Sequence, residues 1–142
     1  MIILNNPNNP SGAVYTREDL EAVAKLAVEH DLLVLSDEMY SRLVYDGAEF
    51  VSVTSLPGMR ERAIVVSGFS KSYAMTGWRL GYLIADKALI APMLKVHQYS
   101  TTCSPTFIQK GLVDSLEDPQ TEKEVQAMLD AFARRRQAIL TG

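Results

Sequence analysis

Three short stretches of the sequence contain the polar side chains whose types and spacing could do chemistry. They are "NPNNPSG" near the start, "SDEMY" in the middle of the first half, and "SGFSKSYAMTGWRLGY" at the centre of the chain. Each follows an apolar run that reads as a buried strand. The six groups that they offer are an amide, a carboxylate, a phenol, a hydroxyl, an amine and a guanidinium: Asn9, Asp37, Tyr40, Ser70, Lys71 and Arg79.

Taken together, these groups suit one organic cofactor. Pyridoxal phosphate needs a lysine amine for a Schiff base, an anion beside its ring nitrogen, donors for its phenolate oxygen and a cation for its phosphate. Taken singly, each residue has a plainer interpretation. Asp37 could cap the next turn, Asn9-Pro10 could be only a turn, Lys71 could be a surface residue and Arg79 a salt-bridge partner.

The elements that must position these groups alternate between strand and helix. Four apolar strands are predicted, at Ile2–Leu4, Leu32–Asp37, Ala63–Gly68 and Gly81–Ala85, with two further short strands in "RLVYDG" and "FVSVTSL". Four helices are predicted, from a Thr16 N-cap to about His30, from an Asp86 cap to about Ser100 with Pro92 starting a turn, from Pro105 to about Leu116, and from about Thr121 to the end.

Continuous apolar strands separated by helices predict an α/β fold with a mostly parallel sheet covered on both faces, a three-layer αβα arrangement. In open sheets of this kind, ligands bind beyond the carboxyl ends of the strands. The amide, the carboxylate and the amine all follow such ends. We therefore expect Asn9, Asp37 and Lys71 to meet at one edge of the sheet.

Composition excludes several other classes of function. The formal charge of −3, from 14 basic and 17 acidic residues, gives no sign of nucleic-acid binding. A single cysteine excludes a disulfide framework, and two distant histidines predict no metal site. The sequence contains neither a run long and apolar enough to span a membrane nor a basic-then-apolar leader. We expect a cytoplasmic protein with no membrane or nucleic-acid partner.

The three stretches, in this order and at this spacing, resemble the class I/II aminotransferases of pyridoxal phosphate fold type I, the aspartate aminotransferase superfamily. The resemblance covers essentially the whole chain, and "YAMTGWRLGY" is similar to the bacterial aspartate/aromatic subgroup. It implies a pyridoxal-phosphate-dependent aminotransferase that moves an amino group from an L-amino acid to a 2-oxo acid. The full-length enzyme would be a homodimer.

The resemblance also implies a role for each residue. Lys71 would hold the cofactor covalently and, once freed, act as the catalytic proton shuttle. Asp37 would pair with the ring nitrogen, and Asn9 and Tyr40 would donate to the O3′ oxygen. Arg79 would bind the phosphate with its planar fork, and Ser70 would donate to the same phosphate.

Some features of the family are altered or absent in this sequence. The family often has a serine three residues before the lysine, where this chain has Gly68, with Ser67 one place earlier. The phosphate loop, the ring-stacking aromatic and the arginine for the substrate carboxylate are expected outside the chain. We therefore expect residues 1–142 to be a partial cofactor-binding large domain, whose last helix, about 121–142, leads toward a small domain. The Asn9-Pro10 bond is predicted to be cis, as the resemblance implies.

Three alternatives to a working aminotransferase stay open at this point. Other fold type I enzymes, such as C–S lyases and decarboxylases, share these cofactor contacts and differ in their substrate contacts. An aminotransferase-like sensor domain of a transcription regulator would also keep Lys71, Asp37 and Arg79. The 142-residue chain by itself could also be inactive, because a truncated sheet leaves apolar faces uncovered.

Overall fold

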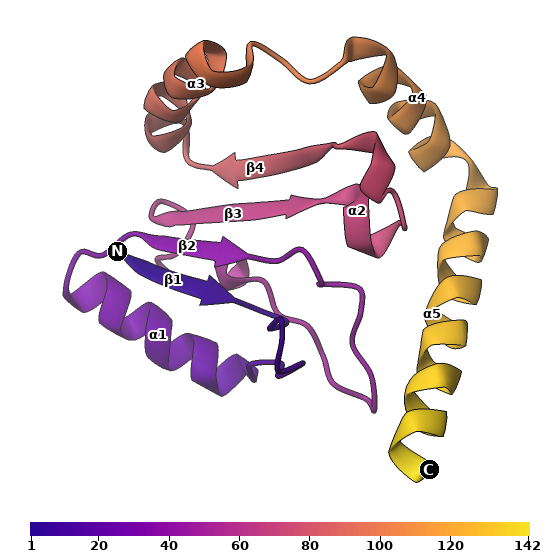
Figure 1. The fold of residues 1–142 in the computed structure, drawn as a ribbon. Helices are drawn as coiled ribbons and strands as arrows, with labels where there is room; N and C mark the ends of the chain where they lie inside the picture. The colour runs from indigo at the N-terminus through magenta and orange to yellow at the C-terminus, as the bar shows by residue number, and fades with distance from the viewer. The chain divides into compact units, whose positions relative to one another are not determined.

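The computed structural model describes residues 1–142 (Figure 1). The chain divides into two compact units, Met1–Cys103 and Ser104–Gly142. The first contains the sheet and every residue that the sequence analysis singled out for chemistry. The second contains two helices.

The first unit is built on a four-stranded sheet in the order β1-β2-β3-β4. Its strands are β1 (Ile2–Asn5), β2 (Val34–Asp37), β3 (Ala63–Gly68) and β4 (Gly81–Ala85). The first three run parallel, and β4 runs antiparallel to β3. The predicted α/β class with a mostly parallel sheet and the four predicted apolar strands are confirmed.

The register of the sheet brings the ends of β1 and β2 into one row, and β3 continues two residues past that row, to Gly68. Asn5 of β1 pairs with Asp37 of β2, which pairs in turn with Val66 of β3. In Figure 1 the arrowheads of β1, β2 and β3 accordingly lie on the same side of the sheet. This row is the edge at which an open α/β sheet binds its ligands.

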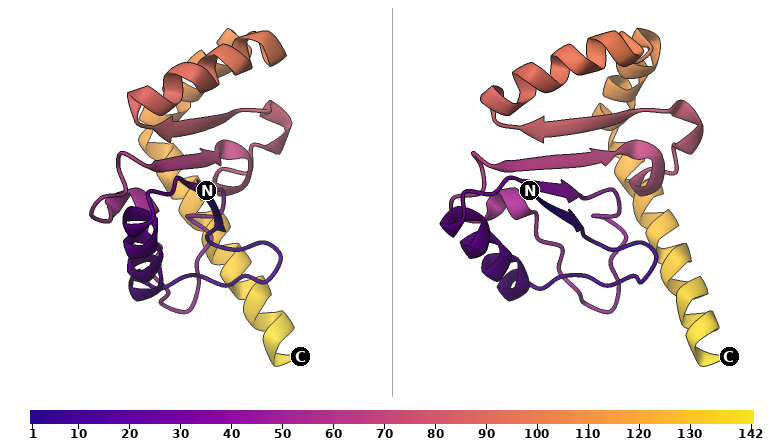
Figure 2. Two further views of the ribbon diagram at one scale, coloured as in Figure 1. Left: turned by 90° about the vertical axis from the view of Figure 1, so that its left-hand side faces the viewer. Right: turned by 60° about the vertical axis from the view of Figure 1, so that its left-hand side comes forward.

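Helix α1 (Arg17–Glu29) covers one face of this sheet. It begins at the predicted cap: Thr16 Oγ1 accepts from the Asp19 backbone N–H at 3.1 Å, and Asp19 Oδ2 accepts from the Thr16 N–H at 2.9 Å. The Asp19 carboxylate also accepts from Thr16 Oγ1 at 2.7 Å, and this bond and the one from the Thr16 N–H lower the pKa of the Asp19 carboxyl. Figure 2 shows α1 beside the sheet in both views.

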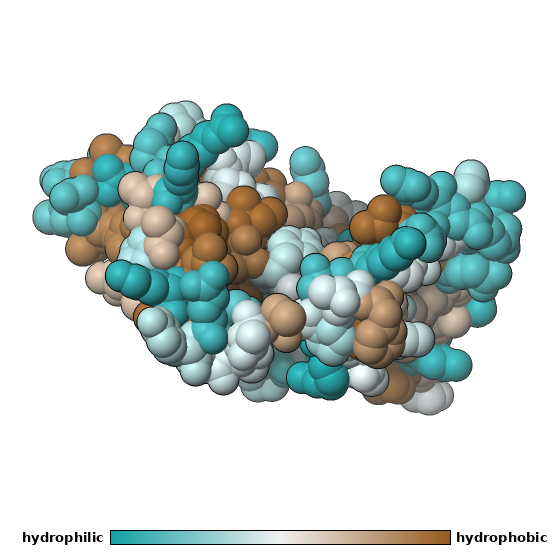
Figure 3. Space-filling view, turned by 90° about the horizontal axis from the view of Figure 1, so that it is seen from above, coloured by the Kyte–Doolittle hydropathy of each residue, from teal (hydrophilic) through white to brown (hydrophobic).

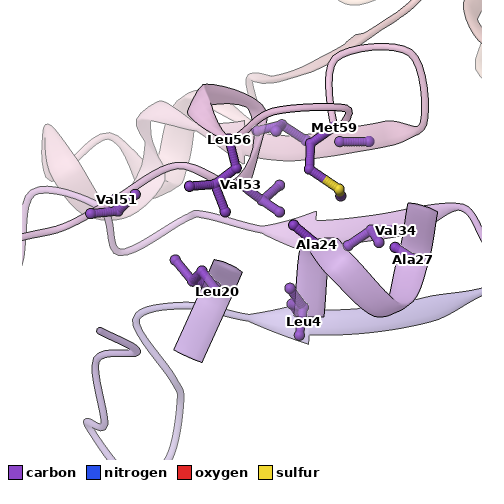
Figure 4. Packing of buried hydrophobic residues seen from close by; sticks show 11 residues of the cluster. Leu4, Leu20, Ala24, Ala27, Val34, Val51, Val53, Leu56 and Met59 are labelled. Carbon is purple, nitrogen blue, oxygen red and sulfur yellow. The ribbon is translucent and has the colours of Figure 1, made fainter. Parts of the chain in front are cut away.

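The core of this unit lies between α1 and the sheet. Leu20, Ala24 and Ala27 of α1 pack against side chains from alternate positions of the strands, Leu4, Val34, Ala63 and Val65 (Figure 4). The segment after β2 supplies the remaining members of the cluster, which are Val51, Val53, Leu56 and Met59. Burial of this apolar area is the main force that holds the unit together.

The two short strands predicted in "RLVYDG" and "FVSVTSL" are wrong. The second stretch instead contains the short 3-10 helix η1 (Val53–Ser55). Backbone groups here bond within the segment, as in Ser55 N–H to Ser52 O and Leu56 N–H to Val53 O, in place of bonds to a strand partner. The apolar residues that suggested a strand are buried because the loop folds onto the core.

Two further short helices follow β3, namely α2 (Phe69–Ser72) and the 3-10 helix η2 (Thr76–Trp78). After β4, helix α3 (Lys87–Thr101) begins at the predicted Asp86 cap, whose carboxylate accepts from the Ala88 N–H at 2.8 Å. The prediction that Pro92 starts a turn is wrong, because it lies inside α3. A proline there gives up one helical hydrogen bond, and the flanking turns retain theirs.

The second unit consists of α4 (Thr106–Glu117) and α5 (Pro119–Thr141). Helix α5 begins earlier than predicted, because the Asp118 carboxylate caps it by accepting from the Gln120 N–H at 2.8 Å and Pro119 occupies the favoured first position. Leu112 of α4 and Val125 of α5 are the buried apolar residues of this unit. No helix of the chain is both long enough and apolar enough to cross a membrane.

Apolar side chains also lie at the surface, where Figure 3 shows them in brown among polar groups. In the first unit the exposed apolar residues include Ile3 of β1, Tyr82, Leu83 and Ile84 of β4, and Leu94, Val96 and Tyr99 of α3. The covering of the sheet is therefore most complete over the face of β1, β2 and β3 that α1 occupies.

The packing of α1 makes a prediction about stability. Leu20 is 1% exposed and Leu26, on the same helix, is 49% exposed. Replacing Leu20 with alanine leaves a cavity and is expected to lower the free energy of unfolding by about 2–5 kcal/mol. Leu26→Ala makes the same chemical change at the surface and is expected to cost less than about 1 kcal/mol. Urea unfolding followed by circular dichroism measures both, and equal losses would contradict the packing described.

Candidate functional site

The loop after β1 presents Asn9 at the sheet edge. The side chain of Asn5, at the end of β1, holds this loop: its Oδ1 accepts from the Asn9 backbone N–H at 2.8 Å and from Asn8 Nδ2 at 3.1 Å. The Asn9-Pro10 bond is cis, as predicted, and the Asn6-Pro7 bond is cis as well. The backbone of Asn9 is thus tied to the strand that delivers it.

The end of β2 presents Asp37 and Tyr40. Asp37 is half-buried, and its Oδ1 accepts from the Met39 N–H at 3.1 Å. Because side chains alternate along a strand, Asp37 lies on the face of the sheet opposite the one that α1 covers. Tyr40 follows in a turn, and its Oη accepts from Asn9 Nδ2 at 3.1 Å. This bond joins residues from two different strand ends.

The end of β3 presents Lys71 on helix α2. The Lys71 side chain is exposed, and its Nζ lies 6.0 Å from the centroid of the Tyr40 ring. Three side chains that follow three parallel strands therefore lie together: the amide of Asn9, the phenol of Tyr40 and the amine of Lys71. A hydrogen bond connects Asn9 to Tyr40, and Lys71 lies at a cation–π distance from the Tyr40 ring.

Ser70 and Arg79 lie in the segment between β3 and β4. Ser70 is half-buried and precedes Lys71 on α2. The exposed Arg79 guanidinium donates to the Thr76 carbonyl at 2.9 Å, within its own turn. Arg79 has a backbone φ of 54°, in the left-handed region that few non-glycine residues adopt. No contact joins Arg79 directly to Asn9, Asp37, Tyr40 or Lys71 in this structure.

The whole chain, residues 1–142, matches the model of the family described as "Aminotransferase class I and II". The chain belongs to this family. It is a pyridoxal-phosphate-dependent family.

Curated relatives and solved structures agree with this membership. The chain is 48% identical to aromatic-amino-acid aminotransferase 2 of Thermococcus litoralis and 46% identical to an aspartate aminotransferase of Pyrococcus abyssi, in each case over 97% of this chain and 36% of the relative. It superposes on the aromatic aminotransferase from Pyrococcus horikoshii with a TM-score of 0.94 and 47% identity, over 98% of this chain and 37% of that one. The chain thus spans about a third of the length of these relatives.

The close packing around Gly68 agrees with the glycine at this position, where the family often has a serine. A Cβ atom at position 68 would lie 3.0 Å from the Cα of Gly81 and 3.1 Å from the Leu80 carbonyl oxygen. There is no room for a side chain where β3 and β4 meet. Ser67 does not substitute for it, because its hydroxyl is buried and donates to the Glu38 carbonyl at 3.3 Å.

The segment bearing Lys71 is also held from the side. Tyr73 ends α2, and its Oη accepts from Arg42 Nη1 at 3.2 Å while the Arg42 guanidinium lies 5.4 Å from its ring centroid. The Phe69 ring lies 5.6 Å from the Tyr73 ring and 5.5 Å from the Tyr82 ring. These contacts tie α2 to the loop after β2 and to β4.

The sequence analysis missed one charged residue of this candidate site, Glu38. It is only 5% exposed, and its Oε1 accepts from Ser36 Oγ at 3.1 Å, Ser52 Oγ at 3.0 Å and the Val53 N–H at 3.2 Å. Burial raises the pKa of the Glu38 carboxyl, and the three hydrogen bonds partly offset that effect. The sequence did carry a signal for burial. Glu38 is two residues after Ser36, so its side chain continues the alternation of β2 on the face that packs against α1.

The raised pKa of Glu38 predicts a pH dependence of stability. A carboxyl that binds protons more tightly in the folded state makes stability fall as pH rises above the usual value of 4.5 toward the raised pKa, after which it levels off. Glu38→Gln removes this proton, so the free energy of unfolding of wild type relative to Glu38→Gln should decrease across that window. Urea titrations at several pH values measure it. A difference that rises with pH, or stays constant, would contradict the burial of this carboxylate.

Proposed function

We propose that the chain forms the cofactor-binding part of a pyridoxal-phosphate-dependent aminotransferase of the aspartate/aromatic type. The enzyme moves an amino group from an L-amino acid to a 2-oxo acid. The observation on which this proposal chiefly rests is the convergence of Asn9, Tyr40 and Lys71 at the carboxyl edge of three parallel strands.

The hydrogen-bond donors at this edge fit the cofactor. Tyr40 Oη accepts from Asn9, so its own proton remains free to donate, and the Asn9 amide has a second N–H. Two donors side by side therefore face a common acceptor, which suits a phenolate oxygen. The exposed Lys71 amine lies 6.0 Å from the centroid of the Tyr40 ring. It is therefore close to these two donors and is suited to be the point of covalent attachment.

The other two predicted partners supply charge. Asp37 is a carboxylate at the central strand end, suited to a protonated pyridine nitrogen. Arg79 has a planar fork, suited to two phosphate oxygens, and its left-handed backbone conformation fits a functional requirement at this position. Ser70 adds a neutral donor beside Lys71 for the same phosphate.

When bound, the cofactor supplies an electron sink for the bond that breaks at the substrate Cα. The residues of this chain would hold and orient it. Asn9 and Tyr40 orient the ring through its O3′ oxygen, and Asp37 keeps the ring nitrogen protonated. Lys71 holds the group and then moves the proton at the substrate Cα.

The substrate class rests on the relatives. Two relatives, at 48% and 46% identity, are described as an aromatic-amino-acid and an aspartate aminotransferase. We therefore propose an aspartate or an aromatic amino acid as donor and a 2-oxo acid as acceptor. A homodimer is proposed for the whole protein.

Chemical labelling tests the proposed attachment residue. Pyridoxal phosphate is added to the purified protein, the mixture is reduced with borohydride, and the modified residue is mapped by mass spectrometry. Lys71 is the expected site, and Lys71→Ala should lose the label, while Lys87→Ala, a change at an exposed lysine of α3, should keep it. Modification at another lysine in wild type would refute the assignment of Lys71.

Product analysis tests the reaction. The cofactor-loaded protein is incubated with aspartate or phenylalanine and 2-oxoglutarate, and the products are separated by chromatography. Amino transfer should yield glutamate and the 2-oxo acid of the donor in equal amounts. Tyr40→Phe removes one donor to the ring oxygen and is expected to slow the reaction by about tenfold or more. Release of carbon dioxide or of an eliminated side chain instead would identify a decarboxylase or a lyase.

A further inference from the structure

Glu38 lies between the two residues that the end of β2 contributes to the site. Its backbone continues the sheet past the last residue of β2, because the Glu38 N–H donates to the Val66 carbonyl at 2.9 Å. Its carbonyl accepts from Ser67 Oγ at 3.3 Å. Both backbone groups of Glu38 are thus held by β3.

The side chain of Glu38 points into the core, where its carboxylate accepts three hydrogen bonds. Of its three donors, the Val53 N–H belongs to a residue whose side chain is 1% exposed and lies within the hydrophobic cluster (Figure 4). Ser36 and Ser52 supply the other two from β2 and from the loop. A charged acceptor with three donors forms stronger bonds than neutral pairs do.

Glu38 is also the first residue of the turn that contains Tyr40. The Ser41 N–H donates to the Glu38 carbonyl at 3.1 Å, which closes the turn Glu38–Ser41. A movement of Glu38 would therefore shift the whole turn. The phenol of Tyr40 would then lose its place beside Asn9 and Lys71.

We infer that Glu38 is a positioning residue, which holds the turn Glu38–Ser41 so that Tyr40 Oη meets Asn9 Nδ2 beside the Lys71 amine. It touches neither substrate nor cofactor, and it acts through Tyr40. The inference deepens the proposed function and, in its consequence for the cofactor, rests on it. Burial raises the pKa of the Glu38 carboxyl, and its three hydrogen bonds act in the opposite direction by favouring the charged form.

The acceptor atom Oε1 of Glu38 explains why an apolar residue could not replace Glu38. Without it, the hydroxyls of Ser36 and Ser52 and the N–H of Val53 lose their shared partner. Unpaired buried donors are costly, so the loop at Ser52–Val53 would move away from β2 to reach water. Glutamine keeps the oxygen and is the conservative variant, while alanine removes it.

The test is a nuclear magnetic resonance experiment on the protein without cofactor. The side-chain amide signals of Asn9 report on its bond to Tyr40, and Tyr40→Phe marks their position when that bond is absent. Glu38→Ala should move the Asn9 signals most of the way to the Tyr40→Phe position. Glu38→Gln should leave them close to wild type.

Leu20→Ala is the control for general destabilisation, because it weakens the same core without touching the turn. It should leave the Asn9 signals in place. Should Glu38→Ala fail to fold, the double variant Ser36→Ala/Ser52→Ala, which leaves the Val53 N–H as the one remaining donor, decides through a shift in the same direction. Unmoved Asn9 signals in a folded Glu38→Ala, or in the double variant, would overturn the inference. An equal shift in Leu20→Ala would overturn it too.

The two proposals can fail separately. The Asn9 signals are read without cofactor, so they decide the role of Glu38 whatever Lys71 binds. If wild type forms no adduct at Lys71 with pyridoxal phosphate, the proposed function fails while the positioning result stands. If wild type is labelled and Glu38→Ala shows unmoved Asn9 signals, the positioning role fails while the function stands.

Discussion

The constraint on which this structure depends is the common direction of β1, β2 and β3. Parallel strands in register end at one edge of the sheet: Asn5 and Asp37 end β1 and β2 in the row that contains Val66, and β3 ends two residues further on, at Gly68. Groups that are far apart in sequence become neighbours there without any long reach. The hydrogen bond from Asn9 to Tyr40 spans 31 positions of the chain and is 3.1 Å long. A slip of one residue in either ladder would turn every side chain of a strand to the other face.

The alternation of side chains along β2 divides the work of two adjacent carboxylates. Asp37 lies on the face away from α1, where a ligand can reach it, and Glu38 turns toward the core. Asp37 is available to a charged ligand, whereas the Glu38 carboxylate bonds to Ser36, Ser52 and Val53 of this chain. Two acidic residues side by side in sequence thus have opposite environments, and burial raises the pKa of Glu38. The difference arises from strand geometry.

Local signals predicted much of this fold. Buried strands, the Thr16 cap and the Asp86 cap were visible because each depends on neighbouring residues. The two predicted short strands were wrong for a tertiary reason: residues such as Val53 are apolar because the loop packs onto the core that it shares with α1 and the sheet. The candidate site residues were predicted because their family spacing is distinctive. Glu38 was not, since its donors at Ser52 and Val53 are far along the chain and the loop conformation that brings them back has no pattern of its own.

The close approach of Gly68 and Gly81 has a consequence for how the site responds to motion. These two residues are paired across β3 and β4, and a Cβ at either would lie 3.0 Å from backbone atoms of the opposite strand. The connection from β3 to β4, which contains Lys71 and Arg79, is therefore a loop whose two ends are held together at this pair of glycines. Any opening or twisting at that base displaces both residues together. The covalent attachment proposed at Lys71 and the ionic one proposed at Arg79 would thus move together. A ligand bound to both residues would restrict the motion of this end of β3 and β4.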